Sequence, residues 1–108
     1  IMAIEEACRR LGGWRLWQCR LYVTLEPCPM CAGAMINARI PTVIYGAKDP
    51  KAGSVDSLVQ MFRLGYNHHP EVISGVLEAE CAQILKDFFR ELRAQKARKA
   101  NTMECTEC

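Results

Sequence analysis

The stretch RLYVTLEPCPMCAGAMINARIPTVIYGA, residues 20–47, predicts the centre of the fold. Residues 20–25 and 42–47 are nearly continuous in strand-forming side chains, as expected of strands buried on both faces. Between them, Pro29 suits the first turn of a helix that runs to about Arg39 and stops before Pro41. A strand, a helix and a strand joined this closely predict a right-handed parallel crossover.

The remaining residues extend this unit into a single α/β domain over residues 1–100. A helix over residues 1–11 should end at the glycine pair 12–13, and a loop should occupy residues 48–56. A short helix over 57–65, a turn and a short strand over 71–75 should follow. A long final helix should then bury an apolar stripe, and residues 101–108 read as a flexible tail. The stripe consists of Leu77, Cys81, Ile84 or Leu85, Phe88 and Leu92.

Length and composition restrict the class of protein. A chain of 108 residues that is 50% hydrophobic fits one small globular domain. No apolar run reaches the length of a membrane span, and no secretory signal pattern opens the chain. The net charge of +2 is too small to indicate a polyanionic partner by itself. The first residue is Ile1, so we expect the sequence to be a fragment of a longer protein.

The cysteines favour metal binding over disulfides. Seven cysteines form an odd set that includes two C-x-x-C pairs, which fits reduced thiols in the cytoplasm. Cys28 and Cys31 lie three residues apart at the predicted helix start, where the helix dipole favours thiolates. Such a pair suits zinc. The alternative is a pair of unliganded cysteines in the core.

A third zinc ligand is harder to find in this sequence. His68 and His69 are the only histidines, and a tandem pair in a turn could place one of them at the metal. Cys105 and Cys108 could instead close a four-cysteine structural site. Both alternatives stay open from the residues alone.

The segments LYVTLEPCPMCAGAMINARI and VIYGAKDPKAG resemble the tRNA-specific adenosine deaminases of bacteria, within the cytidine deaminase-like superfamily. The resemblance runs from Ile1 to about Lys99 and includes NHHPEVISGVLEAEC and DFFRELR. It implies a three-layer α/β/α fold with a mixed, mostly parallel sheet. It also implies one Zn²⁺ per subunit, a tRNA anticodon loop as substrate, a homodimer and a cytoplasmic location.

The chain departs from the family pattern at its first residue. In the family a His-Ala-Glu triplet, which carries the zinc histidine and the proton-shuttling glutamate, directly precedes a helix that reads much like IMAIEEA. The triplet, the family's first helix and its first two strands are absent from this sequence. The resemblance therefore implies that Cys28 and Cys31 are two zinc ligands, and that the 108-residue chain alone is inactive.

The resemblance also implies roles for individual residues. Substrate contacts are expected from the loop after the second strand, from the N-H pair and from the final helix, which carries six basic residues against two acidic ones between Lys86 and Ala100. The Cys28 backbone N–H is a candidate donor to a developing oxyanion, whereas Glu26 is expected to be structural. The expected substrate-binding residues are Lys48, Asp49, Lys51, Asn67, His68, Phe89 and Arg93.

The function predicted from the sequence is the zinc-dependent hydrolytic conversion of wobble adenosine to inosine in tRNA. One alternative is a deaminase of the same superfamily that acts on guanine or cytidine. Another is a noncatalytic zinc module that binds RNA or a partner protein. The small residues 32–34 predict close packing of the zinc helix, either against a second subunit or within the monomer.

Overall fold

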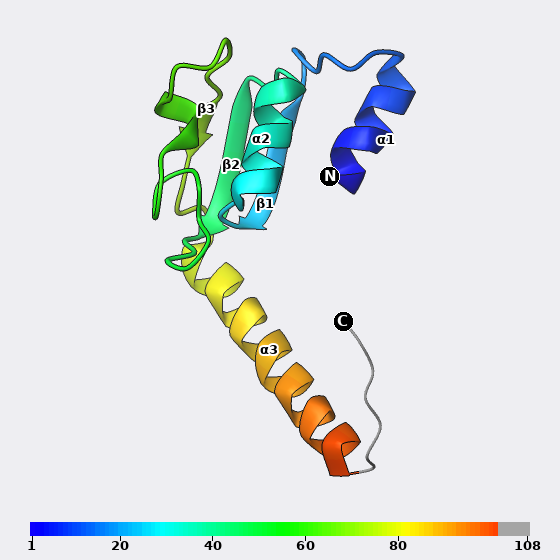
Figure 1. Ribbon diagram of the computed structural model, residues 1–108, viewed down its shortest axis with the longest axis vertical. Helices are drawn as coiled ribbons and strands as arrows, with labels where there is room; N and C mark the ends of the chain where they lie inside the picture. Colours follow the sequence, from blue (N-terminus) through cyan, green and yellow to red (C-terminus); the bar gives the residue numbers. More distant parts are fainter. Residues whose placement is uncertain (102–108) are drawn as a thin grey trace.

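The computed structural model describes residues 1–101, and side chains up to residue 98. The chain forms helices, strands and one 3₁₀ turn in the order predicted from the sequence (Figure 1). The elements are α1 (Met2–Leu11), β1 (Arg20–Leu25), α2 (Pro29–Asn37), β2 (Thr42–Ala47), η1 (Met61–Arg63), β3 (Glu71–Ile73) and α3 (Glu78–Asn101). Within residues 1–101 no helix combines the length and the apolar character needed to cross a membrane.

The sheet is parallel and has the order β1-β2-β3. Arg20 pairs with Thr42 and Leu25 with Ala47, so β1 and β2 end at the same edge of the sheet. The predicted parallel pairing of the two strands, joined through a helix, is therefore confirmed. All three strands of the described part are parallel, and no antiparallel strand occurs among residues 1–101.

The core lies between α2 and one face of the sheet. Ala32, Met35 and Ile36 of α2 belong to one buried cluster with Val43 and Tyr45 of β2. Helix α1 has no fully buried residue but adds partly buried side chains to the same cluster. The other buried members of the cluster are Leu16, Ala38, Ile40, Val55 and Phe62.

The two long strands differ in burial. Five of the six residues of β2 are buried, which confirms the expectation for a central strand. The same expectation was wrong for β1, where exposed and partly buried residues alternate. Strand β1 lies at an edge of the described sheet, and the face that carries Tyr22 is open, so only alternate side chains are covered.

Helix α3 begins against the sheet and then extends away from it (Figure 1). Its main contacts with strands are with β1 and β2. The predicted burial of the stripe was wrong for Leu77, which precedes α3, and for Phe88, since both are exposed. Of the alternatives Ile84 and Leu85, Leu85 is the partly buried one and Ile84 is exposed. The spacing of the stripe is helical, but no element of the described residues packs over that side of the helix. Asn101, predicted to begin the tail, belongs to α3, and residues 102–108 lie outside the described residues.

The segment between β2 and β3 contains less helix than predicted. Instead of a helix over 57–65, only the 3₁₀ turn η1 forms, with Phe62 buried in the core. Backbone bonds hold the rest of the segment. Gly53 N–H donates to Asp49 O at 2.8 Å within the loop, and Ser54 N–H donates to Pro27 O at 2.8 Å, next to the start of α2. The segment is therefore fixed against the start of α2.

Candidate functional site

Cys28 and Cys31 lie where β1 ends and α2 begins. Cys28 is the N-cap of α2, with extended backbone angles (φ −75°, ψ 173°), and Pro29 occupies the first turn. Cys28 O accepts the Ala32 N–H at 2.8 Å, so the first turn is closed behind the cysteine. Proline at this position costs no helical hydrogen bond, and the spacing of three places both sulfurs on one side of the turn.

The two thiols titrate in opposite directions. The backbone N–H of Cys31 donates toward the Cys28 sulfur and, against burial, lowers the pKa of Cys28; the Cys31 side chain and the Met30 N–H act in the same direction. Burial raises the pKa of Cys31, and the neighbouring Cys28 raises it further. Among the described residues all five cysteines are unpaired. The helix start therefore favours one thiolate, held beside a second thiol.

The pair provides part of a metal site. Two sulfurs one helical turn apart suit zinc, but an open catalytic zinc site needs three protein ligands. No group of three or more His, Cys, Asp and Glu residues that could bind a metal ion occurs among residues 1–101. The described side chains thus fit two positions of a zinc site.

The two histidines bond to backbone carbonyl groups. His68 Nε2 lies 2.6 Å from Ile40 O, and His69 Nε2 lies 2.8 Å from Leu64 O. Ile40 precedes β2, so His68 lies at the amino end of the strands, opposite Cys28. The structure therefore does not bring either histidine to the cysteines. The alternative with Cys105 and Cys108 lies outside the described residues.

Glu26 connects the strand before the cysteines to the loop after β2. Its side chain is 2% exposed, and its carboxylate accepts backbone N–H groups from Asp49 (3.1 Å), Val55 (3.3 Å), Asp56 (2.8 Å) and Ser57 (2.8 Å). Burial raises the pKa of Glu26, but the hydrogen bonds from the Ser57 hydroxyl and the backbone outweigh it and lower the pKa to about 2. A carboxylate that is fully engaged in this way positions the loop and is poorly placed to carry protons.

A cavity opens beside the cysteines. It has a volume of about 340 Å³, and its wall includes Cys28, Cys31, Glu26 and Asp49. Ile1 and, from the first turn of α1, Ala3 and Ile4 form part of the same wall, and the rest is largely apolar. The remaining lining residues are Leu21, Tyr22, Val23, Leu25, Pro27 and Met35. The arrangement combines a largely apolar cavity with two thiols, as expected of a small-ligand site.

A second cavity shares Leu25 and Asp49 with the first and has a volume of about 520 Å³. Its wall combines three basic side chains with one aromatic ring and one carboxylate. The lining residues are Leu25, Asp49, Lys51, Leu85, Lys86, Phe89 and Arg93. Basic groups around an aromatic ring suit an anionic ligand that has a flat ring, such as a nucleotide.

A match to a protein-family model shows to which family the chain is related. The model of the MafB19-like deaminases matches residues 1–93, a range that includes Cys28, Cys31, the loop after β2 and most of α3. The chain belongs to the MafB19-like deaminase family.

Several curated relatives of this deaminase carry a more specific name. The chain is 53% identical over 97 residues to a tRNA-specific adenosine deaminase of Bacillus subtilis (strain 168), an alignment that covers 89% of the chain and 60% of the relative. A tRNA-specific adenosine deaminase of Agrobacterium fabrum is 53% identical over 94 residues, covering 86% and 62%. The chain thus spans about three-fifths of the length of these relatives.

A solved structure shares the fold of this deaminase. It comes from biochemical and structural studies of A-to-I editing by tRNA:A34 deaminases at the wobble position of transfer RNA. It superimposes with a TM-score of 0.74 at 50% identity, covering 77% of this chain and 61% of that one. The predicted cytidine deaminase-like α/β fold is therefore confirmed.

The structure brings together some of the substrate residues predicted from the sequence. Asp49, Lys51, Phe89 and Arg93 all line the 520 Å³ cavity. Lys48, Asn67 and His68 do not line it. Asp49 also has a local role, because its carboxylate accepts the backbone N–H groups of Lys51 (3.0 Å) and Ala52 (3.2 Å). Sequence reasoning assigned no binding role to Leu25 or Leu85, which belong to no chemical motif.

Proposed function

We propose that this chain is the greater part of a zinc-dependent hydrolase that converts the wobble adenosine of a tRNA anticodon to inosine. The observation that carries the proposal is the junction of two cavities at Asp49. One holds Cys28 and Cys31, and the other is basic and aromatic. The names of the relatives, which are tRNA-specific adenosine deaminases, support the choice of substrate.

Cys28 and Cys31 would hold the zinc through their sulfurs, one of which is favoured as a thiolate. A zinc ion there would lower the pKa of a bound water and so supply a nucleophile at neutral pH. The third ligand and the proton-shuttling glutamate would come from a His-Ala-Glu segment joined to Ile1. Ile1 lines the same cavity as the cysteines, so residues attached to it would enter the site.

The described side chains would bind and orient the RNA. The apolar wall of the smaller cavity would exclude water from a base turned out of the anticodon loop. In the larger cavity Lys51, Lys86 and Arg93 would contact phosphates, and Phe89 would stack on a neighbouring base. The Cys28 backbone N–H at the helix start remains our candidate for stabilising a developing negative charge.

Three further contacts and the assembly belong to the same proposal. Lys48, Asn67 and His68 would touch RNA outside the two cavities. A second copy would pack on the open side of α2, where a methyl group added to Gly33 meets nothing within 4 Å. The enzyme would act in the cytoplasm, where its thiols remain reduced.

The basic cavity favours this function over a deaminase of free guanine or cytidine, because a free base offers no phosphates to three cations. A noncatalytic zinc module would need its remaining ligands from this chain. Among residues 1–101 no third ligand accompanies the cysteines.

The test uses the longer protein in which a His-Ala-Glu segment precedes Ile1. Bound zinc is measured by elemental analysis, and inosine by mass spectrometry of an anticodon stem-loop. Cys28→Ser should lose both zinc and inosine formation. The matched variant Cys19→Ser, at a partly buried cysteine outside both cavities, should keep both.

The 108-residue chain alone should form no inosine under the same conditions. Full zinc content and full activity in Cys28→Ser would overturn the assignment of the site. If the protein deaminates free guanine or cytidine but forms no inosine in the stem-loop, tRNA is not its substrate and the proposed substrate is wrong.

A further inference from the structure

An aromatic and basic patch lies on the segment that joins α1 to β1. The patch consists of Trp14, Arg15, Trp17 and Arg39, and the first three line a shallow hollow of about 380 Å³ together with Gly13. The Arg15 guanidinium carbon lies 4.6 Å from the ring centre of Trp14 and 5.6 Å from that of Trp17. The Arg39 guanidinium carbon lies 5.9 Å from the Trp14 ring. Each guanidinium is thus held near an indole by a cation–π contact.

Both indoles are open to solvent although the segment that carries them is anchored. Trp14 is 54% exposed and Trp17 is 56% exposed. Leu16, between them, is 1% exposed, and its backbone N–H donates to Ala38 O at 2.8 Å. The buried leucine fixes the backbone and directs both tryptophans outward. The patch is therefore a preorganised platform, and little conformational entropy is lost when a flat ligand stacks on it.

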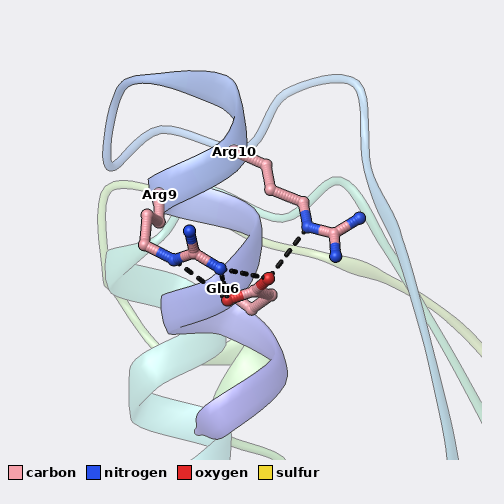
Figure 2. Close-up of polar contacts among 3 residues, drawn as sticks. All are labelled: Glu6, Arg9 and Arg10. Carbon is pink, nitrogen blue, oxygen red and sulfur yellow. Dashed lines mark hydrogen bonds and ion pairs between the residues drawn. The ribbon is translucent and has the colours of Figure 1, made fainter.

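The arginines of the patch have no carboxylate partner among the described residues. The neighbouring helix α1 shows the contrast in Figure 2, where Glu6 pairs with both Arg9 and Arg10. Within residues 1–98 the ion pairs involve Glu6 and Asp87, and none involves Arg15 or Arg39. The patch therefore presents two uncompensated positive charges beside two open rings.

Arg39 is held in a backbone conformation that arginine rarely adopts. It has φ of 60°, in the left-handed region, and directly follows Ala38, the C-cap of α2. Its guanidinium donates to Ile36 O at 3.0 Å and faces Trp14. A glycine would be less strained at this position, so the side chain is retained at an energetic cost.

The patch lies at the opposite end of the sheet from the cysteines. Trp17 precedes the first residue of β1 by three positions, and Cys28 follows its last residue by three. The six residues of β1 separate the two by roughly 20 Å. The patch is therefore distinct from both cavities of the candidate active site, and no residue of either cavity belongs to it.

We propose that the patch binds a stretch of single-stranded RNA outside the deamination site. Unpaired bases would stack on Trp14 and Trp17, and the phosphates beside them would lie against Arg15 and Arg39. The combination of aromatic faces with uncompensated guanidinium groups suits bases and phosphates together. The choice of RNA as ligand rests on the proposed function, whereas the site itself rests on the geometry above.

The chain offers a direct optical test, because its two tryptophans both lie in the patch. Titration with a single-stranded oligouridylate should quench tryptophan fluorescence in a saturable manner. This RNA contains no adenosine, so it cannot be a substrate for deamination. Trp14→Ala should weaken binding about ten-fold, with Trp17 as the remaining reporter. Arg15→Gln should lower the slope of log affinity against log salt concentration by about 1.

Matched variants separate this site from the rest of the molecule. Arg63→Gln removes an exposed arginine on η1 and should leave the affinity and its salt slope unchanged. Cys28→Ser should also keep the quenching, which distinguishes the patch from the candidate active site. Circular dichroism of each variant shows whether its fold is retained.

Absence of saturable quenching at low salt would overturn the proposal. So would quenching that Arg15→Gln and Arg39→Gln both leave unchanged. If Trp14→Ala instead changes the sedimentation of the protein and leaves RNA affinity unaltered, the patch is a protein interface and the proposal is wrong. Quenching by RNA, together with no inosine formation by the longer protein in which a His-Ala-Glu segment precedes Ile1, would sustain this site while removing the proposed function.

Discussion

The carboxylate of Glu26 accepts the backbone N–H of Asp49 at 3.1 Å. Glu26 directly follows β1, and Asp49 is the second residue after β2, so this hydrogen bond joins the carboxyl ends of two parallel strands. Asp49 lines both cavities, and Cys28 is two residues beyond Glu26. The buried glutamate thus fixes the distance between the cysteine pair and the basic cavity.

Replacing Glu26 with glutamine should destabilise the chain strongly. The amide keeps the shape but exchanges one acceptor oxygen for an NH₂ group that faces backbone donors. We expect a loss of about 3 kcal/mol in the free energy of unfolding, because buried hydrogen bonds to a charged group are lost. Urea denaturation measures the free energy of unfolding of each variant.

The control is Glu6→Gln, at an exposed glutamate paired with Arg9 and Arg10, which should cost less than about 1 kcal/mol. Equal losses in the two variants would contradict this role.

The same glutamate predicts how stability depends on pH. Its pKa falls from the usual 4.5 to about 2 in the folded chain, so the folded state favours the carboxylate. Glu26 therefore contributes its full stabilisation above about pH 4.5 and loses it as the pH falls toward 2. Denaturation at several acidic pH values should show a decrease that is shallower in Glu26→Gln. A parallel decrease in both proteins would show that other carboxylates cause it.

Gly46 should be intolerant of any side chain. A methyl group at this position would lie 2.8 Å from Cys81 Cβ and 2.9 Å from Val76 O, and it would also meet Cys81 Sγ. Gly46→Ala should therefore displace the start of α3 from β2 and cost about 2 kcal/mol, as overpacking does. Gly33→Ala is the matched control, because open space surrounds it and alanine favours a helix. Thermal unfolding should show a lower midpoint for the first variant and an unchanged or higher one for the second.

Sequence patterns predicted the elements better than their burial. The proline after Cys28 and the spacing of Cys28 and Cys31 are local features, and they correctly placed the helix start. Burial depends on partners elsewhere in the chain. Strand β1 and the stripe of α3 have apolar residues at the right spacing, yet neither has a neighbour on both sides among residues 1–101. The pattern therefore predicted a covered surface that the described chain leaves open.

In the candidate site, as in the fold, local features were predicted and features that depend on distant segments were missed. The cysteine motif identified its chemistry, and the resemblance indicated Asp49, Lys51, Phe89 and Arg93, which the structure brings to one cavity. No short motif could show that Leu25 also lines this cavity, because its wall combines β1, a loop and α3, segments that are far apart in the sequence. The hydrogen bonds that the backbone N–H groups of residues 55–57 donate to Glu26 could not be predicted for the same reason.

Two isoleucines test whether the outer side of α3 contributes to stability. Ile40 is 1% exposed in the core, whereas Ile84 is 61% exposed on α3. Ile40→Ala should cost about 2 to 5 kcal/mol, because it leaves a cavity where side chains were packed. Ile84→Ala should stay within about 0.5 kcal/mol, because that side chain has little packing to lose and alanine favours a helix. Both values come from urea denaturation of the 108-residue chain.

A loss above about 2 kcal/mol in Ile84→Ala would mean that this side of α3 is covered in solution, by the same chain or by a second copy. Repeating the measurement at several protein concentrations distinguishes these cases, because only the second copy makes the loss depend on concentration.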